Sequence, residues 1–294
     1  MRVTDRLVFE RAARTAGDAR ARAEAAVERA ASGLRVVHPG DDPAASGLVV
    51  LERARAARLD AFATSAARAA DELAAADVAL GEVASAVVRA RELASQLGSA
   101  GYDAAQRTAA ATEVRGLLAG AVSSLNVKVG ARYVLGGRAD AAPPFAASGA
   151  WSGDDAVREV EIAPGVRQAA SVRAGVAVKG TAGGVDVLAT LEALAVALES
   201  NDPAAARAAL DPLADATEQL SSARAEAGAA MAVLDTAVAA SRAARDDARA
   251  GVADLADADV LASATELQLS QRALEAALAA VSQGFQLTLL KKLG

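Results

Sequence analysis

The chain contains no cysteine and a single histidine, His38. Without cysteine, neither a disulfide framework nor thiolate chemistry is available. Any Ser-His-Asp mechanism would have to use His38, which stands beside Pro39 in a predicted loop, and we expect that side chain to face solvent or to pack. No other polar residues converge in the sequence. We therefore expect no enzyme, no cofactor and no small-molecule substrate.

Aromatic residues make up only 2% of the 294 residues, although 53% of the residues are hydrophobic. Alanine, which is small and has the highest helix propensity, supplies most of that hydrophobic content. A core filled with aromatic rings is therefore excluded. The composition favours long helices that pack closely through small side chains.

Charged residues are scattered along the chain and nearly balanced, with 37 acidic against 31 basic residues and a formal net charge of −6. Nucleic-acid binding needs a concentrated basic face, so we expect no nucleic-acid partner. Charges interrupt the first residues, and we expect no cleaved signal peptide. The longest charge-free helical stretch, 116–127, is shorter than the ~20 residues that cross a bilayer. Such a protein would leave the cell only by a dedicated export route.

Two long segments carry the apolar spacing of a coiled coil, with steps that alternate between three and four residues. With the preceding turns from Pro43, the first segment predicts a helical rod of roughly 80 Å, at about 1.5 Å per residue. The second segment predicts its partner, with partial burial where the seam is polar. The predicted seams are Leu59, Phe62, Ala66, Ala69, Leu73, Ala76, Leu80, Val83, Val87, Ala90, Ala94 and Leu97, and Leu210, Leu213, Thr217, Leu220, Arg224, Ala227, Met231, Leu234, Val238, Ser241, Arg245, Ala248, Val252 and Leu255.

Shorter helical patterns occupy both chain ends, and an interruption separates each of them from a rod. Two glycines and two prolines between Ser32 and Pro43 stop the first helix. A step of five from Leu255 to Val260 breaks the last register. We therefore expect the terminal helices to form one module and the rods another. The terminal seams are predicted at Val3, Leu7, Phe9, Ala13, Ala16, Arg20, Ala23, Val27, Ala30 and Leu34, and at Leu267, Leu274, Leu278, Val281 and Phe285.

The segment between the rods has a different character. From 132 to about 184 the helical spacing gives way to Gly, Pro and alternating residues, and a Pro164-Gly165 turn separates two predicted strands. We expect Phe145 and Trp151 to form a small core within this insertion. Because the rods carry their heptads without it, we expect the insertion to be dispensable for folding.

The predicted fold is mainly α, with long antiparallel coiled-coil rods made from both chain ends and a small β-rich insertion in the middle. Helical spacing returns at 185–200 and restarts after Asn201-Asp202-Pro203, a cap followed by a first-turn proline. The predicted domains are an N-terminal helix, 1–42, which pairs with 254–294; rod helices, 43–131; the insertion, 132–184; returning rod helices, 185–253; and the C-terminal helix, 254–294.

Three pairs of acidic residues could bind a metal or act as paired catalytic carboxylates, but local structure explains each of them better. Asp41-Asp42 precedes Pro43, which is the arrangement of an N-cap at Asp42 and a proline at the first helical position. Gly153-Asp154-Asp155 has neither a histidine nor a third ligand nearby and is typical of a turn. Asp257 and Asp259 point to different sides of a helix, which favours capping or a contact to a neighbouring subunit. We expect no metal site.

Several segments resemble the flagellin family. SGLRVVHPGDDPAASG, 32–47, is similar to the signature that follows the first helix there, and its Asp-Asp-Pro resembles the hook-filament junction proteins of the family. LNVKVGARYVLGG and the following PPF resemble a segment in which Asn precedes a Gly-x-Tyr strand, and the run from Asp257 resembles the family ending. The matching residues include Ser32, Gly33, Arg35, Asp41, Asp42, Pro43, Asn126, Gly130, Tyr133, Gly137, Pro144, Phe145, Asp257, Asp259 and Gln271.

The resemblance implies a structural subunit that assembles with copies of itself as a ring at the hook-filament junction. It also implies an extracellular place in the flagellum, export through the flagellar type III apparatus with or without an export chaperone, and contacts with the other junction protein and with flagellin. In that family the terminal helices pair only in the assembled tube. The assembly residues expected here are Val3, Leu7, Phe9, Val27, Leu34, Leu267, Leu274, Leu278, Val281, Phe285 and Leu289.

Two alternatives stay open. A filament flagellin would be made in thousands of copies rather than as a single ring. A coiled-coil adaptor would keep its termini free instead of pairing the first helix with the last.

Overall fold

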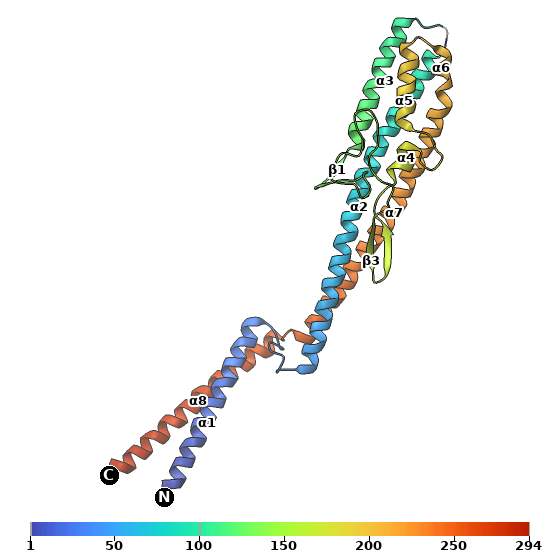
Figure 1. The fold of residues 1–294 in the computed structure, drawn as a ribbon. Coiled ribbons are helices and arrows are strands. Elements are labelled where there is room, and N and C mark those ends of the chain that lie inside the picture. Colours follow the sequence, from blue (N-terminus) through green and yellow to red (C-terminus); the bar gives the residue numbers. More distant parts are fainter. Residues whose placement is uncertain (1, 100, 294) are drawn as a thin grey trace. The chain divides into compact units, whose positions relative to one another are not determined.

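The computed structural model describes residues 2–99 and 101–293, and the side chains of these except 2–6, 8, 9 and 284–293. The described residues form eight helices and two antiparallel two-stranded sheets (Figure 1), which confirms the mainly α prediction. In chain order the elements are α1 (Arg2–Ser32), α2 (Pro43–Leu97), α3 (Ala104–Leu125), β1 (Lys128–Val129), β2 (Arg132–Tyr133), β3 (Glu159–Ala163), β4 (Val166–Ala169), α4 (Ala174–Lys179), α5 (Val187–Glu199), α6 (Pro203–Ala208), α7 (Leu210–Ala256) and α8 (Val260–Leu293).

The chain divides into two compact units, and their boundaries fall inside α2 and α7. Unit 1 comprises 1–58 and 244–294, and unit 2 comprises 59–243. Both helix interruptions lie where the sequence places them, at 33–42 and 257–259. Unit 1 nevertheless extends past these interruptions, because the first turns of α2 and the last turns of α7 bury Ala45, Val49 and Ala248 within it.

The predicted seam of the first rod is confirmed in unit 2, where every seam position from Ala66 to Leu97 is buried. On α7 the apolar seam positions Leu213, Leu220 and Leu234 are buried as well. The polar seam position Arg224 is exposed and forms a two-point ion pair with Asp77 of α2, at 2.8 and 3.2 Å. Partial burial is confirmed at the polar seam positions Thr217 and Arg245, whereas Ser241 is buried.

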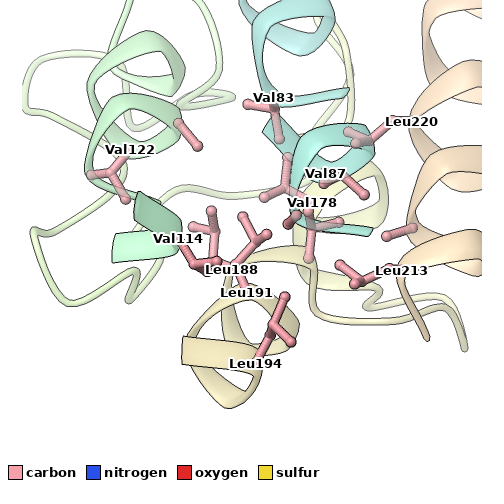
Figure 2. Close-up of a cluster of buried hydrophobic side chains, with 14 of the residues drawn as sticks. Val83, Val87, Val114, Val122, Val178, Leu188, Leu191, Leu194, Leu213 and Leu220 are labelled. Carbon is pink, nitrogen blue, oxygen red and sulfur yellow. The ribbon is translucent and has the colours of Figure 1, made fainter. Parts of the chain in front are cut away.

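The main core of unit 2 lies among four helices, α2, α3, α5 and α7, which run side by side there (Figure 1). Valines from α2 and α3 meet leucines from α5 and α7 in this core, as Figure 2 shows for Val87, Val114, Leu191 and Leu213. At its end, the buried Arg107 of α3 donates to the carbonyls of Leu97 and Ser99 and to the side chain of Asn201. This arginine joins two interhelical turns.

The predicted hairpin of the insertion is confirmed, with β3 and β4 paired antiparallel on either side of Pro164-Gly165. One prediction about this segment is wrong, because 174–179 is helical where no helix was expected. Ala177 and Val178 follow Ala174 by three and four residues, and all three side chains are buried. This short helix therefore buries one face in the main core. Gly180, at φ 65°, ends it.

The insertion does not have a core of its own. Phe145 is buried in the same cluster as the rod helices, and the half-buried Trp151 packs against that cluster. The side-chain amide of Asn126, at the end of α3, donates to the Phe145 carbonyl at 2.8 Å and accepts from the Phe145 amide at 3.0 Å. The expectation of a separate small core is therefore wrong, since the largest buried side chain of the insertion completes the core of the rods. The same contact argues against the prediction that the insertion is dispensable for folding.

Asp154 and Asp155 lie in a segment of the insertion without regular secondary structure and not in the turn that the sequence suggests. The Asp154 carboxylate accepts from the amides of Arg138 and Ala156. The Asp155 carboxylate accepts from the amide of Gly175 and the hydroxyl of Thr181. Both carboxylates therefore replace backbone partners that a sheet would otherwise supply.

Candidate assembly surface

Helices α1 and α8 pair along a narrow alanine seam within unit 1. The buried or half-buried stripe on α1 is Ala12, Ala16, Ala19, Ala23 and Ala26. The predicted seam shares Ala16 and Ala23 with this stripe. Its register is otherwise wrong, because Arg20 and Val27, which it places in the seam, are exposed. The alanine content of α1 permits two registers of the same spacing, and the all-alanine register keeps the charge of Arg20 in water.

On α8 the half-buried stripe is Ser263, Leu267, Ser270, Leu274, Ala277 and Val281, so Leu278 also lies outside the seam. An ion pair joins Arg29 of α1 to Glu266 of α8 at 2.9 Å. The two terminal helices thus pair within one chain, whereas the family resemblance implies pairing only in the assembled tube.

A groove of about 830 Å³ runs beside this seam. Val27, Leu274 and Leu278 line it together with Ala16 and Ala23. Charged side chains form its rim, among them an Arg20–Glu24 pair at 2.9 Å. Exposed apolar side chains gathered in a groove with a polar rim are typical of a surface that another protein segment covers.

The predicted assembly residues fall into three groups. Leu7, Val27 and Leu278 are exposed, and Leu34, Leu267, Leu274 and Val281 are half-buried. Gln271, taken from the family motif, lines the same groove as Val27 and Leu278. The side chains of Val3, Phe9, Phe285 and Leu289 lie outside the described residues.

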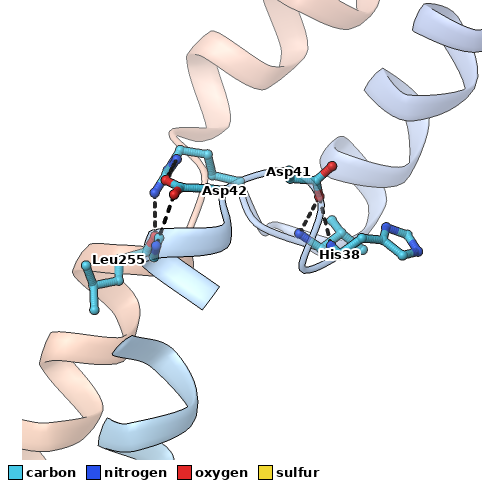
Figure 3. A network of polar contacts seen from close by, with 7 residues as sticks. His38, Asp41, Asp42 and Leu255 are labelled. Carbon is cyan, nitrogen blue, oxygen red and sulfur yellow. Dashed lines mark hydrogen bonds and ion pairs between the residues drawn. The ribbon is translucent and has the colours of Figure 1, made fainter. Parts of the chain in front are cut away.

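The residues between α1 and α2 form a joint with those between α7 and α8 (Figure 3). Gly33, at φ 69°, ends α1 in the left-handed conformation that glycine tolerates best. Leu34 and Asp257 then form an antiparallel bridge. On either side of it, the Arg35 amide donates to the Ala256 carbonyl at 2.7 Å and the Ala258 amide donates to the Gly33 carbonyl at 2.9 Å.

Arg35 links the ends of two helices at this joint. Its guanidinium donates to the Leu255 carbonyl near the end of α7, at 2.7 Å, and to the Asp42 carboxylate, at 3.1 Å. The other oxygen of Asp42 accepts from the Ala45 amide in the first turn of α2. The predicted N-cap at Asp42 with Pro43 at the first helical position is therefore confirmed.

The neighbouring Asp41 carboxylate organises the loop itself. It accepts from the amides of His38 and Val37 at 2.8 and 3.0 Å, and these backbone hydrogen bonds lower the pKa of Asp41. His38 is exposed, as predicted, with its ring 3.9 Å from the Glu28 carboxylate. Ser32 contributes its hydroxyl, which accepts from the Leu34 amide.

We expect Asp42→Ala to loosen the joint selectively, because it removes both the cap of α2 and a partner of Arg35. Hydrogen exchange at Ala45 and the rest of that turn should accelerate several-fold, while unit 2 should be unchanged. The matched control is Asp18→Ala, which removes an exposed carboxylate from α1. Equal exchange in the two variants would contradict the capping role.

Protonation should have the same effect as this substitution. The hydrogen bonds from Ala45 and Arg35 lower the pKa of Asp42 in the folded chain. The stabilisation is therefore complete above the ordinary pKa of an aspartate and is lost as the pH falls through the lowered value.

The other motif residues serve the fold of unit 2. Gly130 and Gly137 have φ of 60° and 68°, and a side chain at Gly137 would collide with Asp154. Lys128 lies 5.4 Å from the centre of the Tyr133 ring, and Pro144 is buried beside Phe145.

Between α7 and α8, Asp259 caps α8 by accepting from the amides of Leu261 and Ala262, which confirms the capping prediction there.

Unit 1 has a second set of exposed apolar side chains that was not predicted from the sequence, namely Leu48, Val50, Leu51, Val260 and Leu261. The sequence contains a signal for this exposure, because four apolar residues in succession at 48–51 cannot all face one side of a helix.

Among the described residues, no three acidic, histidine or cysteine side chains gather to hold a metal ion. No helix in the described ranges has the length and apolarity needed to cross a membrane.

The fold resembles that of solved flagellar hook-associated proteins. Residues 7–135 match the family model of the bacterial flagellin N-terminal helical region. A solved structure described as a flagellar hook-associated protein of Vibrio parahaemolyticus is 20% identical, with a TM-score of 0.67, and the match covers 74% of this chain and 100% of that one.

Two further solved structures share the fold. FlgL of Xanthomonas campestris is 18% identical with a TM-score of 0.59, over 67% of this chain and 98% of that one. The flagellar junction protein FlgL of Legionella pneumophila is 15% identical with a TM-score of 0.55, over 71% of this chain and 100% of that one. Comparison with curated protein sequences found no match.

Proposed function

We propose that the chain is a structural subunit of the bacterial flagellum that assembles with copies of itself at the hook-filament junction. The observation that carries this proposal is the pairing of α1 with α8, the first and last helices, beside an apolar groove that the single chain leaves open. The shared fold with flagellar junction and hook-associated proteins supports the same location.

The partners follow from that location. They are further copies of the chain in a ring, the other junction protein, flagellin, and the flagellar export apparatus with or without a chaperone. The subunit is extracellular once it is in place, and its role is structural rather than enzymatic.

The flagellin N-terminal helical region favours one alternative, a filament flagellin. The coiled-coil adaptor has less support, because its termini would be free, whereas α1 and α8 pair here.

Deleting the gene should distinguish a junction subunit from a filament flagellin. For a junction subunit, we expect cells with hooks but without attached filaments, and flagellin released into the medium. Gold-labelled antibody should mark one band between hook and filament in the parent cells. Label along the whole filament would instead identify a flagellin, and filaments that stay attached in the deletion strain would contradict both flagellar functions.

A further inference from the structure

Unit 1 carries an exposed basic and apolar stripe on α2, called here the basic patch. It consists of Leu48, Leu51, Arg55 and Arg58, which follow one another at steps of three, four and three and therefore share one face of the helix. Leu51 is 66% exposed although it is a large apolar side chain. Among the described residues Arg58 has no ion-pair partner, and Arg55 pairs only with Glu52 of its own helix.

Unit 1 also carries an exposed acidic and apolar surface where α7 ends and α8 begins, called here the acidic patch. Asp247 and Asp254 lie seven residues apart and so share one face of α7. They are followed by Val260 and Leu261, and Leu261 is 78% exposed. Within the described part of the chain, neither aspartate forms an ion pair.

The two patches are complementary in both respects. Each offers apolar side chains beside exposed charges, and the charges of the two patches are of opposite sign. A basic patch docked on the basic patch of another copy would bring arginines together, and such juxtaposed like charges oppose binding. A basic patch docked on an acidic patch covers apolar surface on both sides and pairs the charges.

We propose that the basic patch of one copy binds the acidic patch of the next copy. This inference rests on the proposed function and specifies one of the contacts through which copies would assemble. The interface is heterologous, because it joins two different surfaces of the same chain. Such a contact leaves one free patch at each end, so that it repeats into a ring or a helical array.

The absence of cysteine allows a direct test by cross-linking. Leu51→Cys and Leu261→Cys variants of the full chain are mixed, and a short bis-maleimide is added to the concentrated protein and to flagella isolated from cells that express both variants. Cross-linked dimer should form in the mixture and be scarce in either variant alone. Val78→Cys, at another exposed position of α2, replaces Leu51→Cys in the control mixture and should give little dimer.

Charge reversal tests the electrostatic part of the contact. Arg55→Glu with Arg58→Glu makes both patches of a copy acidic, and Asp247→Arg with Asp254→Arg makes both basic. In backgrounds that carry the two cysteines, either reversal should lower cross-linking by at least about tenfold, and mixing the two reversed chains should restore it. The control reverses Arg68 and Arg91, two exposed arginines of α2, and should leave cross-linking unchanged.

Several results would overturn this interface. They are dimers of Leu51→Cys alone, cross-linking that charge reversal does not change, and no restoration on mixing. If the chain is found at the junction but reversed copies assemble normally there, the interface is wrong and the proposed function stands. If purified copies cross-link as expected but the chain is absent from flagella, the interface stands and the proposed function is wrong.

Discussion

Leu278→Asp should abolish assembly of the subunit into flagella while the melting of the isolated chain stays within error of the parent. Leu278 is 55% exposed and lies outside the α1–α8 seam, so a carboxylate there remains hydrated in the single chain. If copies assemble over the groove, the same carboxylate is buried among apolar side chains without a partner. That burial costs several kcal/mol in each subunit, and a ring repeats the cost.

Leu278 is a better test than its neighbours in the groove. Leu274 is half-buried in the seam, so an aspartate there would weaken the pairing of α1 with α8 as well as any contact between copies. Val196→Asp is the matched control, because Val196 is an apolar side chain of α5 in unit 2 that is 50% exposed. The control strain should swim normally.

The measurements are swimming, filament counts by electron microscopy and thermal melts of the purified variants. Normal filaments with Leu278→Asp would show that the groove is not an assembly surface. A melting transition that collapses in this variant would show that Leu278 supports the fold of the single chain instead.

The long rod helices could be predicted from sequence almost residue by residue. On α2 the apolar positions from Ala66 to Leu97 include Leu73, Leu80 and Val83, whose neighbours at the adjacent register are mostly smaller or polar. Only one stripe can then face the core. The two helix interruptions could be predicted equally well, because proline, glycine and capping aspartates leave the backbone few local conformations.

The terminal helices could not be assigned a register in the same way. On α1 alanine recurs at so many positions that two stripes of the same spacing compete, and the difference in apolar area between them is small. Leu278 and Val27 were predicted to lie in the seam because they are large and apolar. Their exposure follows from tertiary packing, which the spacing of apolar residues does not encode. This ambiguity is also why the candidate groove became apparent only from the structure.

The role of the insertion depended on long-range contacts, which local patterns do not report. Asn126 and Phe145 are far apart in the sequence and meet through two hydrogen bonds. Rarity of aromatic residues suggested a small separate core around Phe145 and Trp151. The helices of unit 2, however, need the phenylalanine ring to fill the space that their alanines and valines leave.

Phe145→Ala should therefore destabilise unit 2 strongly, although it changes neither a rod helix nor a seam residue. The side chain is 2% exposed, and removing a buried phenylalanine ring typically costs about 3–5 kcal/mol because the transfer free energy is lost and a cavity remains. Val166→Ala is the matched control from the same insertion, since Val166 is 51% exposed and its truncation should change stability by less than about 0.5 kcal/mol.

Urea denaturation followed by circular dichroism measures both variants. Phe145→Leu should lie between the parent and Phe145→Ala, because it restores apolar volume without the full ring. Asn126→Ala should destabilise in the same direction, since it leaves the Phe145 amide and carbonyl without their partners. If Phe145→Ala unfolded at the same urea concentration as Val166→Ala, the insertion would be an independent addition to the rods, and its replacement by a short linker would be tolerated after all.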